Sequence, residues 1–229
     1  MTSKILVAIA ATTMVATAGS AMSADLIIDT PAEPIAVSAP GDWYVSLFAG
    51  GVWSPEIEAD YNDDVVGYDI TTDLGLAFGI AVGTKVFENV RIEAELSGTV
   101  NSISEAYEED DDFLYPDFDG SVSALYLLGN VWFDLDTGSG FTPYIGGGVG
   151  VAGVDVNFEQ WDWELDGGGF AYQLGAGVKV DVADNIALDL GYRFKSVPGV
   201  TVDDVDGDDD WLTFDLQSHV FQAGLTFSF

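Results

Sequence analysis

Charged side chains that alternate with apolar residues are the first candidates for chemistry in this sequence. In the segment from Val90 to Leu96, Arg91, Glu93 and Glu95 occupy every second position. Two carboxylates on one face could act as an acid–base pair, but buried charges are tolerated only when they are paired and hydrogen-bonded. We therefore expect Glu93 and Glu95 to pair with Arg91 and Arg193. The predicted charge network comprises Arg91, Glu93, Glu95, Lys179, Asp189 and Arg193.

The single histidine, His219, is the only side chain that could serve as the base of a Ser–His hydrolase. When the alternation is counted back from Phe229, His219 shares the face of the apolar residues of the last segment. That position is typical of an interfacial aromatic rather than of a catalytic base. We predict no catalytic residue and no enzymatic activity.

Two acidic runs could hold divalent cations, but neither has the spacing of an EF-hand loop. When the loop glycine is aligned on Gly207, Val202 falls on the first ligand position and Thr213 replaces the bidentate glutamate. We expect at most diffuse, weak Ca²⁺ or Mg²⁺ binding, or simply a solvated polyanionic surface, and no cofactor. The acidic residues concerned are Glu108, Glu109, Asp110, Asp111, Asp112, Asp203, Asp204, Asp206, Asp208, Asp209 and Asp210.

The composition combines extreme negative charge with high hydrophobicity. Thirty-nine acidic residues face 6 basic ones, yet 48% of residues are hydrophobic and 13% are aromatic. A disordered acidic chain has few aromatic residues, so we expect acidic and apolar segments to be segregated in a folded structure. A net charge of −33 also excludes nucleic acid as a partner, because phosphate recognition requires Lys and Arg. The absence of cysteine excludes disulfides and thiolate metal sites.

The N-terminus has the three parts of a secretory signal. Lys4 precedes an apolar stretch from Ile5 to about Ala18, and small residues follow at Ala21 and Ser23. We expect residues 1–23 to be a cleaved signal peptide, 24–42 a proline-containing periplasmic lead-in, and 43–229 a single folded domain.

A two-residue hydrophobic period runs through that domain and predicts β-strands, because successive side chains of a strand point to opposite faces. Each predicted strand supplies the roughly 9–11 residues that cross a membrane at a tilt. The eight strands are predicted over Trp43–Val52, Leu74–Val86, Val90–Val100, Val122–Asp134, Pro143–Val154, Phe170–Val180, Ile186–Lys195 and Leu216–Phe229.

The connections between these strands alternate in length. Short ones are expected at Phe87–Asn89, Leu135–Thr142 and Asp181–Asn185, and long ones at Trp53–Asp73, Asn101–Ser121, Asp155–Gly169 and Ser196–Asp215. The long connections contain 27 of the 39 acidic residues. Short periplasmic turns and long extracellular loops are typical of outer-membrane barrels. The sequence therefore predicts an all-β, eight-stranded antiparallel up-and-down transmembrane β-barrel with four long acidic extracellular loops.

The basic residues support a barrel over a soluble β-sandwich. Lys85, Arg91, Lys179, Arg193 and Lys195 all share the parity of the small or polar face of their strands, and none lies in a long loop. A sandwich would bury the apolar face, whereas a barrel exposes that face to lipid and avoids the cost of a cation there.

The last segment alternates apolar residues up to a terminal aromatic. Phe221, Leu225, Phe227 and Phe229 form one face, which resembles the signal read by the barrel assembly machinery of Gram-negative bacteria. The sequence as a whole resembles the small OmpA-type outer-membrane β-barrels (porin-family surface antigens), especially those of alphaproteobacteria. The stretches that carry the resemblance are Trp43–Ser46, Asn89–Glu93, Asp136–Gly138 leading to Pro143–Gly150, Ala171–Gly177, and the end at Phe229.

The resemblance implies an integral protein of a Gram-negative outer membrane, without the peptidoglycan-binding domain of full-length OmpA. We expect a structural or surface-interaction role around a largely filled lumen, because eight strands enclose an interior just wide enough for side chains. A small cation-preferring diffusion channel is the alternative. The expected partners are outer-membrane lipid and lipopolysaccharide, reached through divalent cations, and the barrel assembly machinery.

Overall fold

In a computed structural model of the protein, residues 43–229 are described except for 62–65, 109–112, 160–162 and 205–210. The predicted signal peptide (1–23) and lead-in (24–42) lie outside the described residues. Within the described part, no helix is long and apolar enough to cross a membrane.

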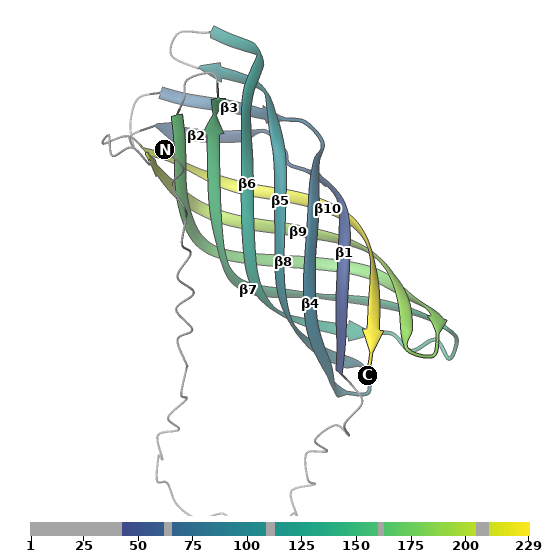
Figure 1. The fold of residues 1–229 in the computed structure, drawn as a ribbon. Helices are drawn as coiled ribbons and strands as arrows, with labels where there is room; N and C mark the ends of the chain where they lie inside the picture. The colour runs from purple at the N-terminus through teal and green to yellow at the C-terminus, as the bar shows by residue number, and fades with distance from the viewer. Residues whose placement is uncertain (1–42, 62–65, 109–112, 160–162, 205–210) are drawn as a thin grey trace, which may run out of the picture. The chain divides into compact units, whose positions relative to one another are not determined.

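The described residues form ten antiparallel strands in one sheet (Figure 1). Eight of them close a ring in the order β1, β4, β5, β6, β7, β8, β9, β10, with β10 pairing back to β1. The strands are β1 (Trp43–Trp53), β2 (Ile57–Tyr61), β3 (Val66–Thr72), β4 (Gly75–Phe87), β5 (Val90–Glu108), β6 (Phe113–Asp134), β7 (Phe141–Phe158), β8 (Trp163–Ala183), β9 (Ile186–Asp204) and β10 (Trp211–Ser228).

The predicted all-β, antiparallel up-and-down barrel is confirmed, but the strand count differs from the prediction. The hairpin β2–β3 lies in the segment that was predicted to be the first long loop. It pairs with β10 on one side and with β5 on the other. The six longest strands, β5 to β10, thus belong to two stacked rings of eight strands. We call the ring completed by β1 and β4 the membrane-level ring, and the ring completed by β2 and β3 the outer ring.

The membrane-level ring is apolar outside and polar inside. On β10, Phe221, Leu225 and Phe227 face outward with 62%, 43% and 36% exposure, while Gln222 and Thr226 between them are buried. The exposed apolar band along β10 runs from the level of His219 to Phe229, about 25 Å across at a rise of about 3.3 Å per residue and a tilt of about 40°. This height matches the hydrocarbon layer of an outer membrane.

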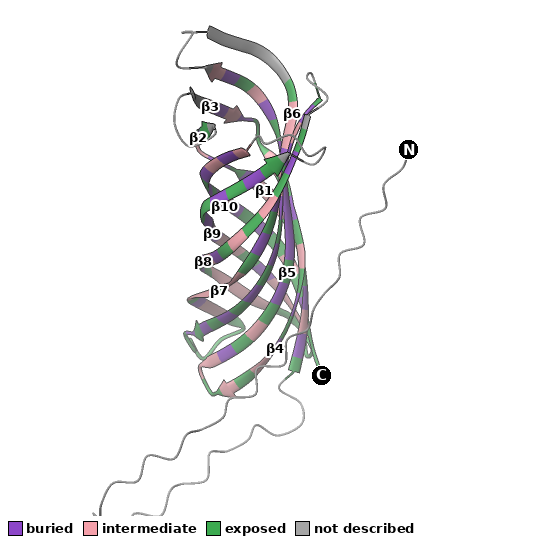
Figure 2. Cartoon of the chain, turned by 90° about the vertical axis from the view of Figure 1, so that its left-hand side faces the viewer, coloured by how far each residue is buried: buried purple, intermediate pink, exposed green. Residues whose placement is uncertain are grey.

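The outer ring has the opposite chemistry. Buried and exposed residues alternate along the strands (Figure 2), and in the outer ring the buried ones are apolar. Farther along β10, Leu212, Phe214 and Leu216 are buried, whereas Asp215 and Gln217 face outward and are exposed. The same inversion occurs on every strand of the outer ring, so its interior is a single apolar cluster. Water solvates its outer surface, and a polar exterior over an apolar core is the arrangement of a soluble β-structure.

Most of the predicted long loops are therefore strand. Residues 101–108, 121, 155–158 and 196–204, for example, were placed in loops but extend β5, β6, β7 and β9. The six strands shared by the two rings, β5 to β10, have 18 to 22 residues, well beyond the number needed to cross a bilayer. The loop prediction was wrong because a high density of carboxylates was taken as a sign of irregular structure.

The short turns lie at the other end of the barrel, as predicted. β4 and β5 are joined through Glu88 and Asn89, and β8 and β9 through Asp184 and Asn185. The third turn contains Gly138 at a φ of +67°, and the Asp136 carboxylate accepts a hydrogen bond from the Gly138 N–H at 2.8 Å. A positive φ strains most residues but not glycine, so the turn is specified locally.

Candidate functional site: the lumen charge network

The inward face of the membrane-level ring gathers charged side chains from distant parts of the chain. β5 contributes Arg91, Glu93 and Glu95, because a strand presents every second residue to one face. β6, β8 and β9 face β5 across the interior or beside it and supply the remaining members. The lumen charge network, as the structure places it, consists of Arg91, Glu93, Glu95, Asp134, Lys179, Asp189, Arg193 and Lys195.

Arg91 is the centre of the first group. Its Nε donates to both carboxylate oxygens of Asp134, at 3.0 and 2.8 Å, and its Nη1 donates to the Tyr44 hydroxyl at 2.8 Å. The Glu93 carboxylate lies 4.0 Å from the same Nη1 and accepts hydrogen bonds from Tyr44 and Trp132. These contacts tie β1, β5 and β6 together. Charge-assisted bonds of this kind are stronger than neutral ones, because the charge strengthens the attraction.

Glu95 is the centre of the second group, and its cation is Lys195 rather than the predicted Arg193. The Lys195 ammonium donates to Glu95 at 2.6 Å and to Ser97 at 2.7 Å. Asn130 and Gln173 also donate to Glu95, at 2.9 and 2.7 Å. Lys195 lies two residues beyond Arg193 on the same face of β9, and that shift brings its ammonium to the Glu95 carboxylate.

Arg193 belongs to a third group around Tyr144. Its Nη2 donates to the Tyr144 hydroxyl at 2.9 Å, and that hydroxyl donates to Asp189 at 2.6 Å. The guanidinium also lies over the Trp132 ring, 4.2 Å from its centre, which is favourable for a cation. Lys179 lies over the Tyr44 ring at 4.4 Å. Lys179 and Arg193, for which no carboxylate lies in direct contact among the described residues, are thus stabilised by aromatic rings.

Glycines on the inward face make room for the two tyrosines. A Cβ at Gly83 would collide with the Tyr44 hydroxyl, and one at Gly177 would collide with the Tyr144 hydroxyl. These glycines are therefore required by space rather than by backbone conformation, because both lie within regular strands.

The sequence placed six members of the network on the inward face but omitted two. Asp134 and Lys195 were assigned to that face by parity without being included in the network. Asn130, Gln173, Tyr44 and Tyr144, which connect the charges, are equally visible as polar residues of the right parity. Which of them meet depends on the stagger of the strands, and a one-dimensional pattern does not reveal it.

His219 lies on the outer surface, on the side that was predicted. Its Nδ1 is 2.6 Å from the Tyr192 hydroxyl, and its ring stacks on Trp53 with centroids 5.0 Å apart. Phe194 and Phe221 complete a cluster of outward-facing aromatic rings on neighbouring strands. Such a belt is typical of a membrane–water interface, and it marks the boundary between the membrane-level ring and the outer ring.

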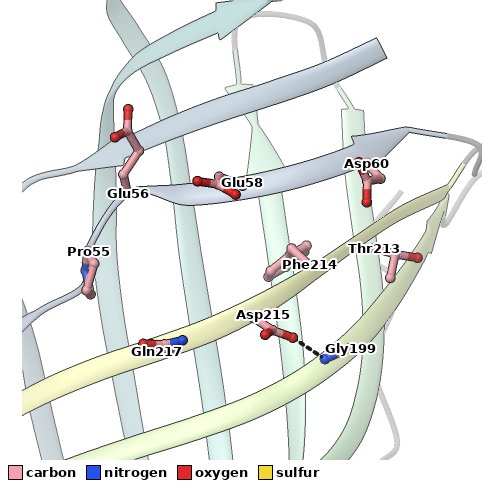
Figure 3. A pocket seen from close by; sticks show the side chains of 9 residues that line it. All are labelled: Pro55, Glu56, Glu58, Asp60, Gly199, Thr213, Phe214, Asp215 and Gln217. Carbon is pink, nitrogen blue, oxygen red and sulfur yellow. Dashed lines mark hydrogen bonds between the residues drawn. The ribbon is translucent and has the colours of Figure 1, made fainter. Parts of the chain in front are cut away.

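A second concave feature lies on the outer ring, between β2 and β10, and has a volume of about 430 Å³ (Figure 3). It occurs where the chain leaves β1 and has not yet begun its pairing with β10 at Ala59. The Asp215 carboxylate accepts a hydrogen bond from the Gly199 N–H at 2.6 Å. Besides Asp215 and Gly199, the residues that line this pocket are Pro55, Glu56, Glu58, Asp60, Thr213, Phe214 and Gln217.

The acidic runs predicted to bind cations weakly fall largely outside the described residues. Residues 109–112 and 205–210, with Glu109 to Asp112, Asp206 and Asp208 to Asp210, are not described. Glu108 and Asp204 end β5 and β9, and Asp203 is exposed on the outer surface. Among the residues that are described, no group of three or more metal-ligating side chains is arranged to hold an ion.

The predicted assembly signal occupies the last strand. Phe221, Leu225, Phe227 and Phe229 all face outward, and the Phe229 N–H donates to the Trp43 carbonyl at 3.0 Å. The C-terminal residue is thereby fixed beside the first strand, where the ring closes. Its recognition by an assembly machinery stays a prediction.

The model of the outer membrane protein beta-barrel domain family matches residues 9–229, nearly the whole sequence. The chain belongs to this family. It is accordingly a protein of the Gram-negative outer membrane, and the membrane-level ring, with its apolar outer face, is the part that suits lipid.

Relatives and a solved structure agree with that assignment. An uncharacterized protein of Brucella suis is 27% identical over 81% of this chain and 79% of its own length. A candidate adhesin of Rickettsia conorii is 28% identical, with 69% of each protein covered. The crystal structure of Neisserial surface protein A has a TM-score of 0.53 at 17% identity and covers 82% of this chain and 97% of its own. At that identity, the structural likeness concerns the fold alone.

Proposed function

We propose that this protein is a non-conducting outer-membrane barrel with a structural or surface-interaction role, and that it displays an acidic, β-structured surface outside the cell. The apolar interior of the outer ring is the observation that carries this proposal. Every strand of that ring directs apolar side chains inward, and the members of the apolar cluster that belong to β7, β9 and β10 are 5% exposed or less.

An ion that entered from outside would have to cross this apolar layer. It would lose its hydration shell there without gaining polar partners, and that loss costs many kcal/mol for a bare charge. The acidic mouth that suggested a cation-preferring channel therefore leads to a closed interior. On the inner side of this layer, Arg91 pairs with Asp134, Lys195 pairs with Glu95 across the lumen, and Arg193 donates to the Tyr144 hydroxyl.

Single-channel recording in planar lipid bilayers tests this proposal. We expect no stable openings from the wild-type protein across a wide voltage range. As a positive control, Leu165→Gly combined with Leu212→Gly removes two buried side chains of the apolar layer. Stable cation-selective openings of the wild type would overturn the proposal in favour of a diffusion channel.

The surface that the outer ring presents is anionic, so a lipid partner would have to be reached through cations. Exposed carboxylates include Glu56, Glu58, Asp60, Asp155, Glu164, Asp166, Asp203 and Asp215. In the described part of the chain, no Lys or Arg lies on this surface. We propose that Ca²⁺ or Mg²⁺ joins these carboxylates weakly to lipopolysaccharide phosphates, and that the same field repels nucleic acid.

Calorimetry tests the cation bridge with the metal ions alone. Folded protein in micelles should release or absorb heat with millimolar Ca²⁺, and binding to lipopolysaccharide-containing vesicles should be lost on chelation. No heat, or vesicle binding that persists after chelation, would contradict the bridge.

The absence of enzymatic activity is part of the proposal as well. His219 is engaged by Tyr192 and Trp53, which gives it the role of an interfacial aromatic. Glu93 and Glu95 each accept several hydrogen bonds, so neither carboxylate is available as a base. Hydrolysis of peptide, ester or acyl-lipid substrates that disappears in His219→Ala or Glu93→Gln would contradict this part of the proposal.

A further inference from the structure

Three aspartates lie side by side across the outer surface of the outer ring. Asp155 on β7 is directly opposite Asp166 on β8, and Asp166 is directly opposite Asp203 on β9. All three side chains are exposed and point outward. We call these residues the aspartate row.

The surroundings of the aspartate row bring no positive charge to it. Ser123 of β6 is opposite Asp155, and Trp211 of β10 is opposite Asp203. On the strands of the row itself, the nearest described neighbours on the same face, apart from glycines, are Asn157, Glu164 and Thr201. Asp204, which follows the row in β9, is paired with Leu165. All described Lys and Arg residues belong to the membrane-level ring.

Like charges directly opposite one another destabilise a strand pair, because their Cβ atoms are only about 5 Å apart. Asp166 has such a neighbour on both sides and experiences the repulsion twice. The pKa of Asp155 is raised, first because the side chain is partly buried and second because Asp166 is negatively charged. Asp155 lies beyond Val151, the last exposed apolar residue of β7, and hence outside the lipid band.

We propose that the aspartate row makes the outer ring more stable in acid. Protonation of a carboxyl in the row relieves the repulsion and strengthens the pairing of β7, β8 and β9. A carboxyl whose pKa is higher in the folded state gains protons on folding, so its contribution favours folding as the pH falls and is lost as the pH rises. Most proteins behave in the opposite way, because their paired carboxylates are lost in acid. The inference concerns stability alone and does not depend on whether the barrel conducts.

Hydrogen exchange of the folded protein in lipid vesicles tests this proposal. Protection factors should be compared at about pH 4, close to the ordinary pKa of an aspartate, and at about pH 7.5; they are ratios to the intrinsic rate and so remove the direct effect of pH on exchange. In the wild type, we expect the amides near Val154, Leu165 and Val202 to be about fivefold better protected at the lower pH.

The variant Asp166→Asn keeps the shape of the central side chain and removes both repulsive pairs. At the higher pH, the amides of this variant should be as well protected as those of the wild type are at the lower pH. Protection in the variant should therefore no longer depend on pH. Asp73→Asn is the control, because Asp73 is exposed and lies outside the paired strands, between β3 and β4; this variant should behave as the wild type. Unchanged pH dependence in Asp166→Asn, or protection of the wild type that falls in acid, would overturn the proposal.

Discussion

The ammonium of Lys195 lies 2.6 Å from the carboxylate of Glu95, although the two residues are 100 positions apart in the chain. Both side chains are almost completely buried, at 2% and 3% exposure. The pair joins β9 to β5 across the interior of the membrane-level ring. It lies below the apolar interior of the outer ring and is enclosed by Ser97, Asn130 and Gln173, which bond to its charges.

Removal of one partner of this pair should destabilise the barrel strongly. Lys195→Met leaves the Glu95 carboxylate buried without its cation, and the loss of a single partner of a buried pair costs about 3–5 kcal/mol. Unfolding free energies from denaturant titrations in lipid vesicles would measure this. The double variant Glu95→Gln with Lys195→Met should recover most of the loss, because no uncompensated charge remains. A double variant as unstable as the single one would show that packing rather than charge dominates.

Gly177 provides the space for the Tyr144 hydroxyl, so its replacement should be costly. In Gly177→Ala the added methyl group meets that hydroxyl, and overpacking of this kind costs about 1–3 kcal/mol. Gly129 lies on the outward face and is the control, because a Cβ there would meet only the Val149 carbonyl oxygen, at an ordinary contact distance of 3.9 Å. The same titrations should show a loss for Gly177→Ala and little change for Gly129→Ala. Equal stabilities of the two variants would contradict the described packing of the Tyr144 hydroxyl against Gly177.

Neighbouring positions of β9 distinguish a packed outer ring from a solvated loop. Val202 is buried and Thr201 is exposed. Val202→Asn places an amide in an apolar interior, at a cost of about 1–3 kcal/mol for the unsatisfied group, whereas Thr201→Asn keeps the amide in water. Protease digestion of the folded protein should cut the outer ring faster in Val202→Asn alone. If both variants are cut at the wild-type rate, this segment is a loop.

The sequence was sufficient to predict the membrane-level ring because its alternation is simple there. The parity of Arg91, Glu93 and Arg193 follows from the two-residue period, and the position of His219 followed from counting back along one strand. The partner of Glu95 could not be predicted, because it depends on the stagger of β9 against β5. Stagger is a property of the closed ring and not of either strand.

The outer ring was missed for a different reason. Leu212, Phe214 and Leu216 alternate with polar residues as regularly as the residues of the membrane-level ring do, but here the apolar face points inward. In β9 an irregularity at Pro198 and Gly199, where Gly199 has a φ of +57°, moves the inward positions from Val197 to Val200. Such a bulge reverses the parity. The many carboxylates on the outward face were then taken as a sign of loops. The strands in fact continue, and only the medium around them changes from lipid to water.

Hydrogen exchange of the wild-type protein in lipid vesicles tests the packed outer ring most directly. The amides of residues 113–121 in β6, 152–158 in β7 and 211–218 in β10 lie outside the lipid band. Most of these residues were predicted to lie in loops. The two-ring structure predicts that these amides are protected for hours, as paired backbone around a buried core should be. Exchange of these segments within seconds, while the membrane-level strands remain protected, would contradict it.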